Sequence, residues 1–173
     1  MNPFPRGFTL TELLITLGLI AALSAIAVPA GLGIRRKAQQ AACLSNLRQI
    51  GAGLEGYLQD HAQILPEWQA GRRSKTEDVP VMETALLPYV GSPEVFHCPA
   101  DKTEHARSGS SYLWNTTQSG RHRAKLEFFG TGGDPRRVPL VTDKEAWHPG
   151  EPGVNFLYAD SSVSGGVNFG VNE

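Results

Sequence analysis

The segment from Leu13 to Ala30 constrains this chain more than any other, because its 18 consecutive residues carry no charge. A helix that crosses the hydrocarbon core of a bilayer needs about 20 mostly apolar residues. The segment therefore predicts a membrane-embedded helix near the beginning of a chain of 173 residues. Glu12 stands at the edge of the segment, where a carboxylate is costly and suggests a functional partner.

A short polar stretch that contains Arg6 and Gly7 precedes the apolar segment. Gly7 leaves room for a protease to reach the backbone, and it also weakens a helix. If the chain were cut after Gly7, the new amine on Phe8 would lie about one helical turn from Glu12. In hydrocarbon an unpaired amine and an unpaired carboxylate are both costly, whereas they attract each other strongly. Side-by-side packing would let Glu12 of one copy neutralise the Phe8 amine of its neighbour.

The string Arg-Gly-Phe-Thr-Leu-Thr-Glu at residues 6–12, with the apolar run behind it, resembles the N-terminus of type IV pilins and type II secretion pseudopilins. The resemblance implies that a prepilin peptidase cuts between Gly7 and Phe8 and methylates the Phe8 amine. Glu12 matches the glutamate of the family, and Pro29 matches its helix-bending proline.

The same resemblance implies a non-enzymatic structural subunit of a type II secretion pseudopilus or a type IV pilus-like filament. It places the chain in the bacterial inner membrane as a single-pass protein, with the N-terminus cytoplasmic and the head periplasmic, before extraction into the filament. The partners it implies are the prepilin peptidase, other pilin or pseudopilin subunits, an inner-membrane assembly platform and membrane lipid. The formal net charge of −1 provides no basic field, so no nucleic-acid partner is expected.

Two alternatives remain open. The residues 27–30, Ala-Val-Pro-Ala, loosely resemble a secretory cleavage site, which would release a soluble protein. Otherwise an uncleaved helix anchors a periplasmic ligand-binding module that does not polymerise. The basic residues after the apolar run, Arg35, Arg36 and Lys37, would by the positive-inside rule alone place the C-terminal part in the cytoplasm. We favour the opposite topology, because the 6–12 string is more specific than a charge count.

Apolar side chains continue beyond the membrane segment at spacings of 4, 3, 4 and 3, namely Cys43, Leu47, Ile50, Leu54 and Tyr57. This stripe predicts that the helix extends from Phe8 to about His61. We expect an α+β fold, a pilin-like lollipop whose long N-terminal helix has a membrane-embedded first half and packs on a small antiparallel β-sheet head. The expected parts are a cleaved leader (1–7), the embedded half (8–30), the amphipathic half (31–63) and a globular periplasmic head (64–173).

In the head, runs of apolar and β-branched residues indicate strands at 95–98, 111–114, 138–141 and 154–158, and residues 79–90 form a short helix or an extended segment. Residues 42–51 and 96–101 resemble a pseudopilin-like group of planctomycete and verrucomicrobial bacteria. That group ends in a histidine, a spacer and an Asp-Gly hairpin.

In this chain His148 and Asp160 are separated by 11 residues, and Ser161 stands at the glycine position of that hairpin. Because serine tolerates a left-handed conformation poorly, we expect a wider hairpin. The residues His148, Asp160 and Ser161 are also of catalytic-triad types. Ser161 lacks a nucleophile-elbow setting, however, so we do not expect an enzyme.

Cys43 lies on the apolar stripe, and Cys98 follows a strand candidate that should pack against it. In an exported, oxidising location such a pair tends to form a disulfide, which we expect here in preference to two buried thiols. A structural zinc set is the weaker interpretation, because its members lack the usual ligand spacing: Cys43, His97, Cys98 and His105.

No cofactor is expected, although calcium is an alternative, since some major pseudopilins hold this ion. The candidate ligands are Asp134, Asp143 and Asp160, which do not form a spaced acidic loop.

Overall fold

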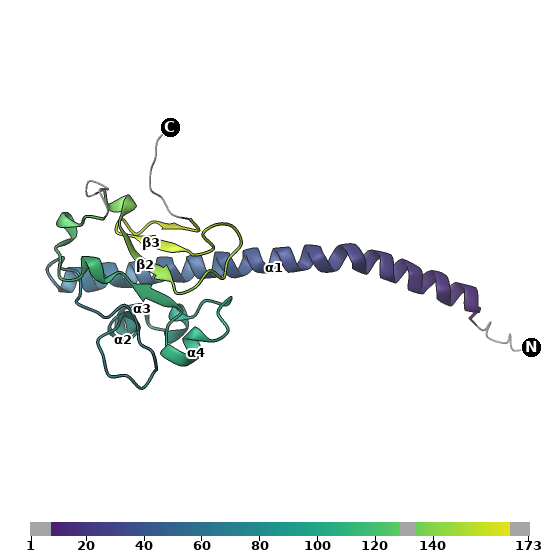
Figure 1. The fold of residues 1–173 in the computed structure, drawn as a ribbon, viewed down its shortest axis with the longest axis horizontal. Helices are drawn as coiled ribbons and strands as arrows, with labels where there is room; N and C mark the ends of the chain where they lie inside the picture. Colours follow the sequence, from purple (N-terminus) through teal and green to yellow (C-terminus); the bar gives the residue numbers. More distant parts are fainter. Residues whose placement is uncertain (1–7, 129–133, 167–173) are drawn as a thin grey trace, which may run out of the picture. The chain divides into compact units, whose positions relative to one another are not determined.

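The computed structural model describes residues 8–128 and 134–166. The contacts of the chain divide it into two units, residues 1–35 and residues 36–173. Helix α1 (Leu10–Asp60; Figure 1) contributes residues to both units. Pro29 lies inside this helix. Proline is disfavoured inside a helix because it removes one backbone hydrogen bond.

In the second unit the apolar stripe of α1 forms one side of the hydrophobic core. Its buried members are Cys43, Leu47, Ile50, Leu54 and Leu58. Their spacing of three and four residues places them on one face of the helix. The first four were predicted, whereas Leu58 takes the buried place expected of Tyr57. Tyr57 is only partly buried and packs at the edge of this core.

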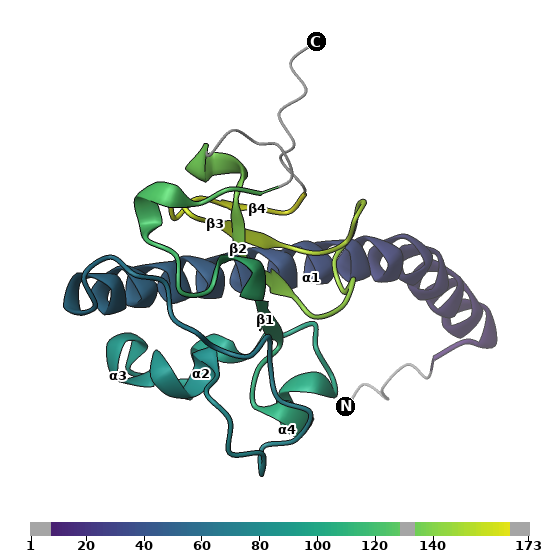
Figure 2. The same ribbon diagram turned by 60° about the vertical axis from the view of Figure 1, so that its left-hand side comes forward.

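The other side of the core is a four-stranded sheet of β1 (Tyr112–Trp114), β2 (Pro139–Asp143), β3 (Phe156–Tyr158) and β4 (Val163–Ser164). The strands pair antiparallel in chain order, so the sheet is a simple meander. A row of paired residues, Trp114, Val141 and Leu157, crosses it, and the Leu157 side chain approaches Gly51 of α1. Figures 1 and 2 show this part of α1 running along the sheet. The expected α+β arrangement is confirmed.

Figure 2 shows three short helices on the same side of α1 as β1: α2 (Met82–Ala85), α3 (Leu87–Val90) and α4 (Glu104–Ser108). Helix α3 packs closely on two glycines of α1. A Cβ on Gly53 would lie 2.6 Å from Cγ1 of Val90, and one on Gly56 would lie 2.9 Å from Cδ1 of Tyr89. The two glycines therefore allow the backbones to approach each other.

Single turns of 3₁₀ helix make up the remaining regular structure: η1 (Pro93–Phe96), η2 (Thr116–Gln118), η3 (Arg123–Lys125) and η4 (Pro135–Arg137). The strand expected at 95–98 is wrong, because η1 occupies its first half and His97 and Cys98 are not in a strand. Ser92 accepts a hydrogen bond from the Glu94 N–H, and Pro93 stands in the first turn. A serine cap followed by proline is a strong helix-start signal, which outweighs the β propensity of valine and phenylalanine here.

The hairpin between β3 and β4 is tight, so the wider hairpin expected from Ser161 is also wrong. The N–H of Ser161 donates to the Tyr158 carbonyl at 2.9 Å, and the N–H of Tyr158 donates to the Ser162 carbonyl at 2.9 Å. Ser161 itself takes the left-handed conformation, with φ of 67°. A position that usually favours glycine is thus occupied by serine, and its side chain has a partner on α1, described below.

Candidate functional site

The start of α1 is closed by a reciprocal pair of side chains, Thr9 and Glu12. Oε2 of Glu12 accepts hydrogen bonds from the Thr9 N–H at 2.9 Å and from its hydroxyl at 2.7 Å. The Glu12 N–H donates to Oγ1 of Thr9 at 3.2 Å. This is a capping box, which satisfies backbone donors that the first turn leaves unpaired. Among the described residues, Oε1 of Glu12 has no hydrogen-bond partner.

The expected cleavage point lies directly before this cap. Gly7 and the leader 1–7 fall outside the described residues, whereas Phe8 is described and its side chain is 80% exposed. Phe8 and Glu12 are thus both accessible at the beginning of the first unit. The Thr9–Glu12 spacing is a capping signal readable from sequence, but the role of Thr9 was not anticipated.

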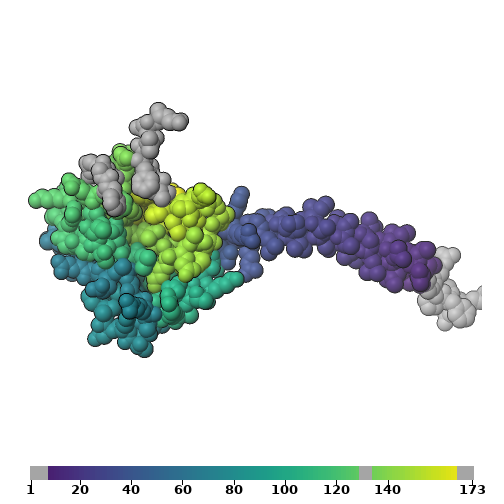
Figure 3. Space-filling model, in the orientation of Figure 1, coloured from purple at the N-terminus to yellow at the C-terminus, as the bar shows by residue number. Residues whose placement is uncertain are grey.

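The apolar segment of α1 that follows is exposed throughout. Every described residue up to Lys37 is exposed, and the large side chains Leu10, Ile26 and Ile34 are each at least 69% exposed. An 18-residue window of α1 has a mean hydropathy of 2.3, so this helix is long and apolar enough to cross a membrane. Figure 3 shows the segment uncovered on the face drawn. Such a surface is unfavourable in water and requires a lipid or protein environment.

In the second unit, a disulfide joins Cys43 of α1 to Cys98 in the loop after η1. Both residues are fully buried. The Cys98 N–H donates to the hydroxyl of Ser111 at 2.9 Å, and that hydroxyl donates to Asp101 at 2.6 Å. The disulfide therefore links α1 to a loop that is itself held by buried hydrogen bonds.

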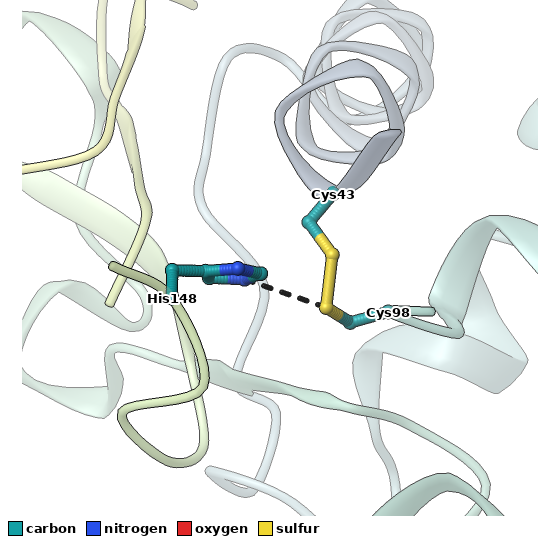
Figure 4. A group of neighbouring side chains, drawn as sticks. All are labelled: Cys43, Cys98 and His148. Carbon is teal, nitrogen blue, oxygen red and sulfur yellow. Dashed lines mark hydrogen bonds between the residues drawn. A yellow bond between two sulfur atoms is a disulfide. The ribbon is translucent and has the colours of Figure 1, made fainter. Parts of the chain in front are cut away.

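His148 lies next to this disulfide (Figure 4). Its Nε2 atom is 3.4 Å from Sγ of Cys98 and 3.3 Å from Oδ2 of Asp143, and the side chains of His148 and Asp143 are completely buried. Asp143 ends β2, and its Oδ2 accepts the N–H of Asn155 just before β3, at 2.6 Å. The loop between the two strands brings His148 inward. No local pattern in the sequence predicts that His148 pairs with Asp143.

The three aspartates considered for calcium do not form a site together. Asp134 caps η4 by accepting the Arg136 N–H, and Asp160 accepts from the N–H and hydroxyl of Ser162. Asp143 instead bonds Asn155 and His148. Within residues 8–128 and 134–166, the one close group of three or more metal-binding residue types is Cys43, Cys98 and His148.

Neither the zinc set considered from the sequence nor the three residues of catalytic-triad types come together as a group in the structure. His97 and His105 stack with ring centroids 4.4 Å apart, outside the group formed by the two cysteines and His148. Ser161 donates its hydroxyl proton to Glu55, and Nε2 of His148 is directed at Asp143 rather than Asp160. The residues His148, Asp160 and Ser161 therefore do not form a hydrolytic triad.

Comparison with protein families identifies the N-terminal segment. The family model described as the prokaryotic N-terminal methylation motif matches residues 5–28, which contain Gly7, Phe8 and Glu12. No curated protein and no solved structure matches the chain. The motif, the α+β fold and the membrane-capable helix support a type IV pilin-like protein of the kind that prepilin peptidase processes. The match does not extend into the head.

Proposed function

We propose that this chain is a structural subunit of a type II secretion pseudopilus or type IV pilus-like filament. Prepilin peptidase cuts it between Gly7 and Phe8 and methylates the new amine. The subunit waits in the inner membrane with its head in the periplasm, and an assembly platform then extracts it into the filament. The observation that carries the proposal is the methylation motif at residues 5–28, followed directly by an exposed apolar helix.

The carboxylate of Glu12 has the accessibility that the assembly step requires. Its Oε2 is engaged by Thr9, and Oε1 is left without a partner among the described residues. In a filament, Oε1 accepts a charge-assisted hydrogen bond from the Phe8 amine of a neighbouring subunit. Pairing is strongly favoured, because neither charge is solvated in an apolar surrounding. The pair also sets the axial stagger between subunits.

Cleavage is tested by the intact mass and N-terminal fragmentation of the full chain, produced together with a prepilin peptidase in a bacterial membrane. We expect a chain that starts at Phe8 and carries one additional methyl group. A chain that starts at Met1 would favour the alternative, a membrane-anchored periplasmic module that does not polymerise. A start after Ala30 would indicate a secreted soluble protein and would exclude the filament.

Assembly is tested separately with three variants in cells that carry the assembly platform. Glu12→Gln keeps an acceptor for the capping box but removes the charge, and Glu12→Ala removes both. Thr9→Ala removes the cap and keeps the charge. We expect both Glu12 variants to insert normally yet be absent from the sheared filament fraction, whereas Thr9→Ala still assembles. Normal filaments from Glu12→Gln would refute charge neutralisation.

The orientation needs its own test, because Arg35, Arg36 and Lys37 oppose it by simple charge count. We expect the head to be digested by a protease added outside spheroplasts and to be protected in inverted vesicles. The reverse result would place the head in the cytoplasm and remove the basis for a periplasmic filament.

A further inference from the structure

The disulfide belongs to a larger group of buried metal-binding side chains that filament assembly does not use. The Sγ atoms of Cys43 and Cys98 and one ring nitrogen of His148 all lie within 4.8 Å of one another. Oδ2 of Asp143 lies 3.3 Å from Nε2 of His148. Thiolate, imidazole and carboxylate are the ligand types that zinc takes in proteins. Two sulfurs, one nitrogen and one oxygen would complete a four-coordinate set.

Two of the six ligand–ligand separations, both from Nε2 of His148, are close to those of tetrahedral zinc. With metal–ligand distances of about 2.3 Å to sulfur and 2.0–2.2 Å to nitrogen and oxygen, a tetrahedral ion holds nitrogen and sulfur about 3.5 Å apart and nitrogen and oxygen about 3.4 Å apart. Nε2 of His148 is 3.4 Å from Sγ of Cys98 and 3.3 Å from Oδ2 of Asp143. Once the bond between the sulfurs is broken, they can separate to the roughly 3.8 Å that two zinc-bound thiolates require.

Two buried polar atoms of His148 and Asp143 have no partner among the described residues. Nδ1 of His148 and Oδ1 of Asp143 are buried and have no hydrogen bond. Buried polar atoms are nearly always paired. These two atoms are not the proposed ligand atoms, so they would stay unpaired with a metal bound, and they show only that polar side chains surround the disulfide. A group serving only to cover a disulfide would be expected to be apolar, since an unpaired buried polar atom destabilises the fold.

We propose that this group is a redox-gated zinc site, in which the disulfide and the bound metal are alternative states. A dithiol or trialkylphosphine supplies two electrons, is itself oxidised, and converts the disulfide into two thiols. Zn²⁺ then binds both sulfurs as thiolates and releases two protons. Nε2 of His148 and Oδ2 of Asp143 complete the coordination. In either state Cys43 of α1 stays linked to the Cys98 loop.

The metal reaches the site through the loop that carries His148. Glu145, Ala146 and residues 149–152 of this loop are exposed, whereas His148 is buried beneath them.

The test uses the full chain in detergent micelles, reduced anaerobically with a water-soluble trialkylphosphine and freed of reductant. Co²⁺ is added as a spectroscopic probe, and Zn²⁺ is then titrated against it. We expect one equivalent of Co²⁺ to give intense visible bands of tetrahedral geometry with a thiolate charge-transfer band, all removed by one equivalent of Zn²⁺. The oxidised chain should give none of these bands. Reduced, folded protein that gives no such bands would overturn the proposal.

Two variants test the other ligands, and a third is the control. We expect His148→Gln and Asp143→Asn to weaken zinc affinity by more than the roughly 10- to 100-fold that loss of a residue behind a ligand costs. His105→Gln is the matched control, because His105 lies outside the group, and it should bind as the parent does. Unchanged affinity in His148→Gln would overturn the four-ligand site. If a reduced protein unfolds, recovery of its circular dichroism on adding Zn²⁺ supports the proposal, and lack of recovery contradicts it.

Discussion

The hydroxyl of Ser161 donates a 2.7 Å hydrogen bond to Oε1 of Glu55, although the two residues are 106 positions apart in the chain. Oε2 of Glu55 pairs with Arg123, whose Nη2 donates to the Ala159 carbonyl at 3.2 Å. Burial alone would raise the pKa of Glu55, but hydrogen bonds from Arg123 and Ser161 and the charge of Arg123 hold it below its usual value. These contacts attach the hairpin turn to α1 and account for serine at a left-handed position.

Substitutions at Ser161 separate its hydrogen bond from its backbone strain. Ser161→Ala loses the bond but keeps the left-handed conformation, so we expect unfolding to become easier by about 1–2 kcal/mol. Ser161→Gly also loses the bond but relieves the strain, so it should be about 1 kcal/mol more stable than the alanine variant. Urea unfolding of the full chain in micelles, followed by tryptophan fluorescence, measures both. Equal stabilities would mean that the left-handed conformation carries no cost.

The contact between α1 and α3 depends on Gly53. Alanine at an exposed helix position is favoured over glycine by about 0.8–1.0 kcal/mol. At Gly53, however, the new methyl group would collide with Val90, and overpacking of this kind costs about 1–3 kcal/mol. We therefore expect Gly53→Ala to lower the melting temperature of the head. Gly31→Ala is the control, because nothing lies within 4 Å of its Cβ position. A head stabilised by Gly53→Ala would contradict the close packing.

Asp101 should make the stability of the head depend on acid pH. Burial would raise the pKa of Asp101, but hydrogen bonds from the Ser111 hydroxyl and the N–H groups of Thr103, His105 and Glu104 outweigh it and hold the pKa below its usual value. The hydrogen bonds to the Asp101 carboxylate therefore stabilise the head above the pKa that this group has in the unfolded chain, about 3.9. This stability is lost as the pH falls through the lower pKa of Asp101 in the folded protein.

We expect Asp101→Asn to destabilise the head by about 1–3 kcal/mol at neutral pH and to flatten the decline of stability in acid. Asp78→Asn, at an exposed position, controls for the change in net charge. Denaturant unfolding at a series of pH values measures both. If the free energy of unfolding of Asp101→Asn falls as steeply in acid as that of the parent, another group governs this decline.

The disulfide closes a loop between residues 55 positions apart. In the chain-entropy model such a closure is worth about 4 kcal/mol. We expect the double variant Cys43→Ala/Cys98→Ala to unfold at a correspondingly lower urea concentration in metal-free buffer, while its helix content is kept. An unchanged unfolding midpoint would mean that the disulfide contributes nothing to the stability of the head.

Local patterns in the sequence were sufficient for the elements that depend on short-range periodicity. The uncharged run ending at Ala30 indicates a membrane-capable helix, and the spacing of Leu47, Ile50 and Leu54 indicates which face of its continuation is buried. Three of the four expected strands are present as β1, β2 and β3, because short runs of apolar and β-branched residues bounded by turn formers define a strand locally. The fourth failed at Ser92 and Pro93, whose capping chemistry outweighed β propensity.

The tertiary structure alone decided which distant side chains meet. His148 belongs with Asp143 and the disulfide rather than with Asp160, because the loop between β2 and β3 folds inward over the end of β2. Ser161 takes a left-handed conformation in the turn between β3 and β4, where its hydroxyl meets Glu55 on α1. Helix and strand periodicities reflect neighbours within a few residues, whereas these contacts depend on chain closure over tens of residues, which no local pattern encodes.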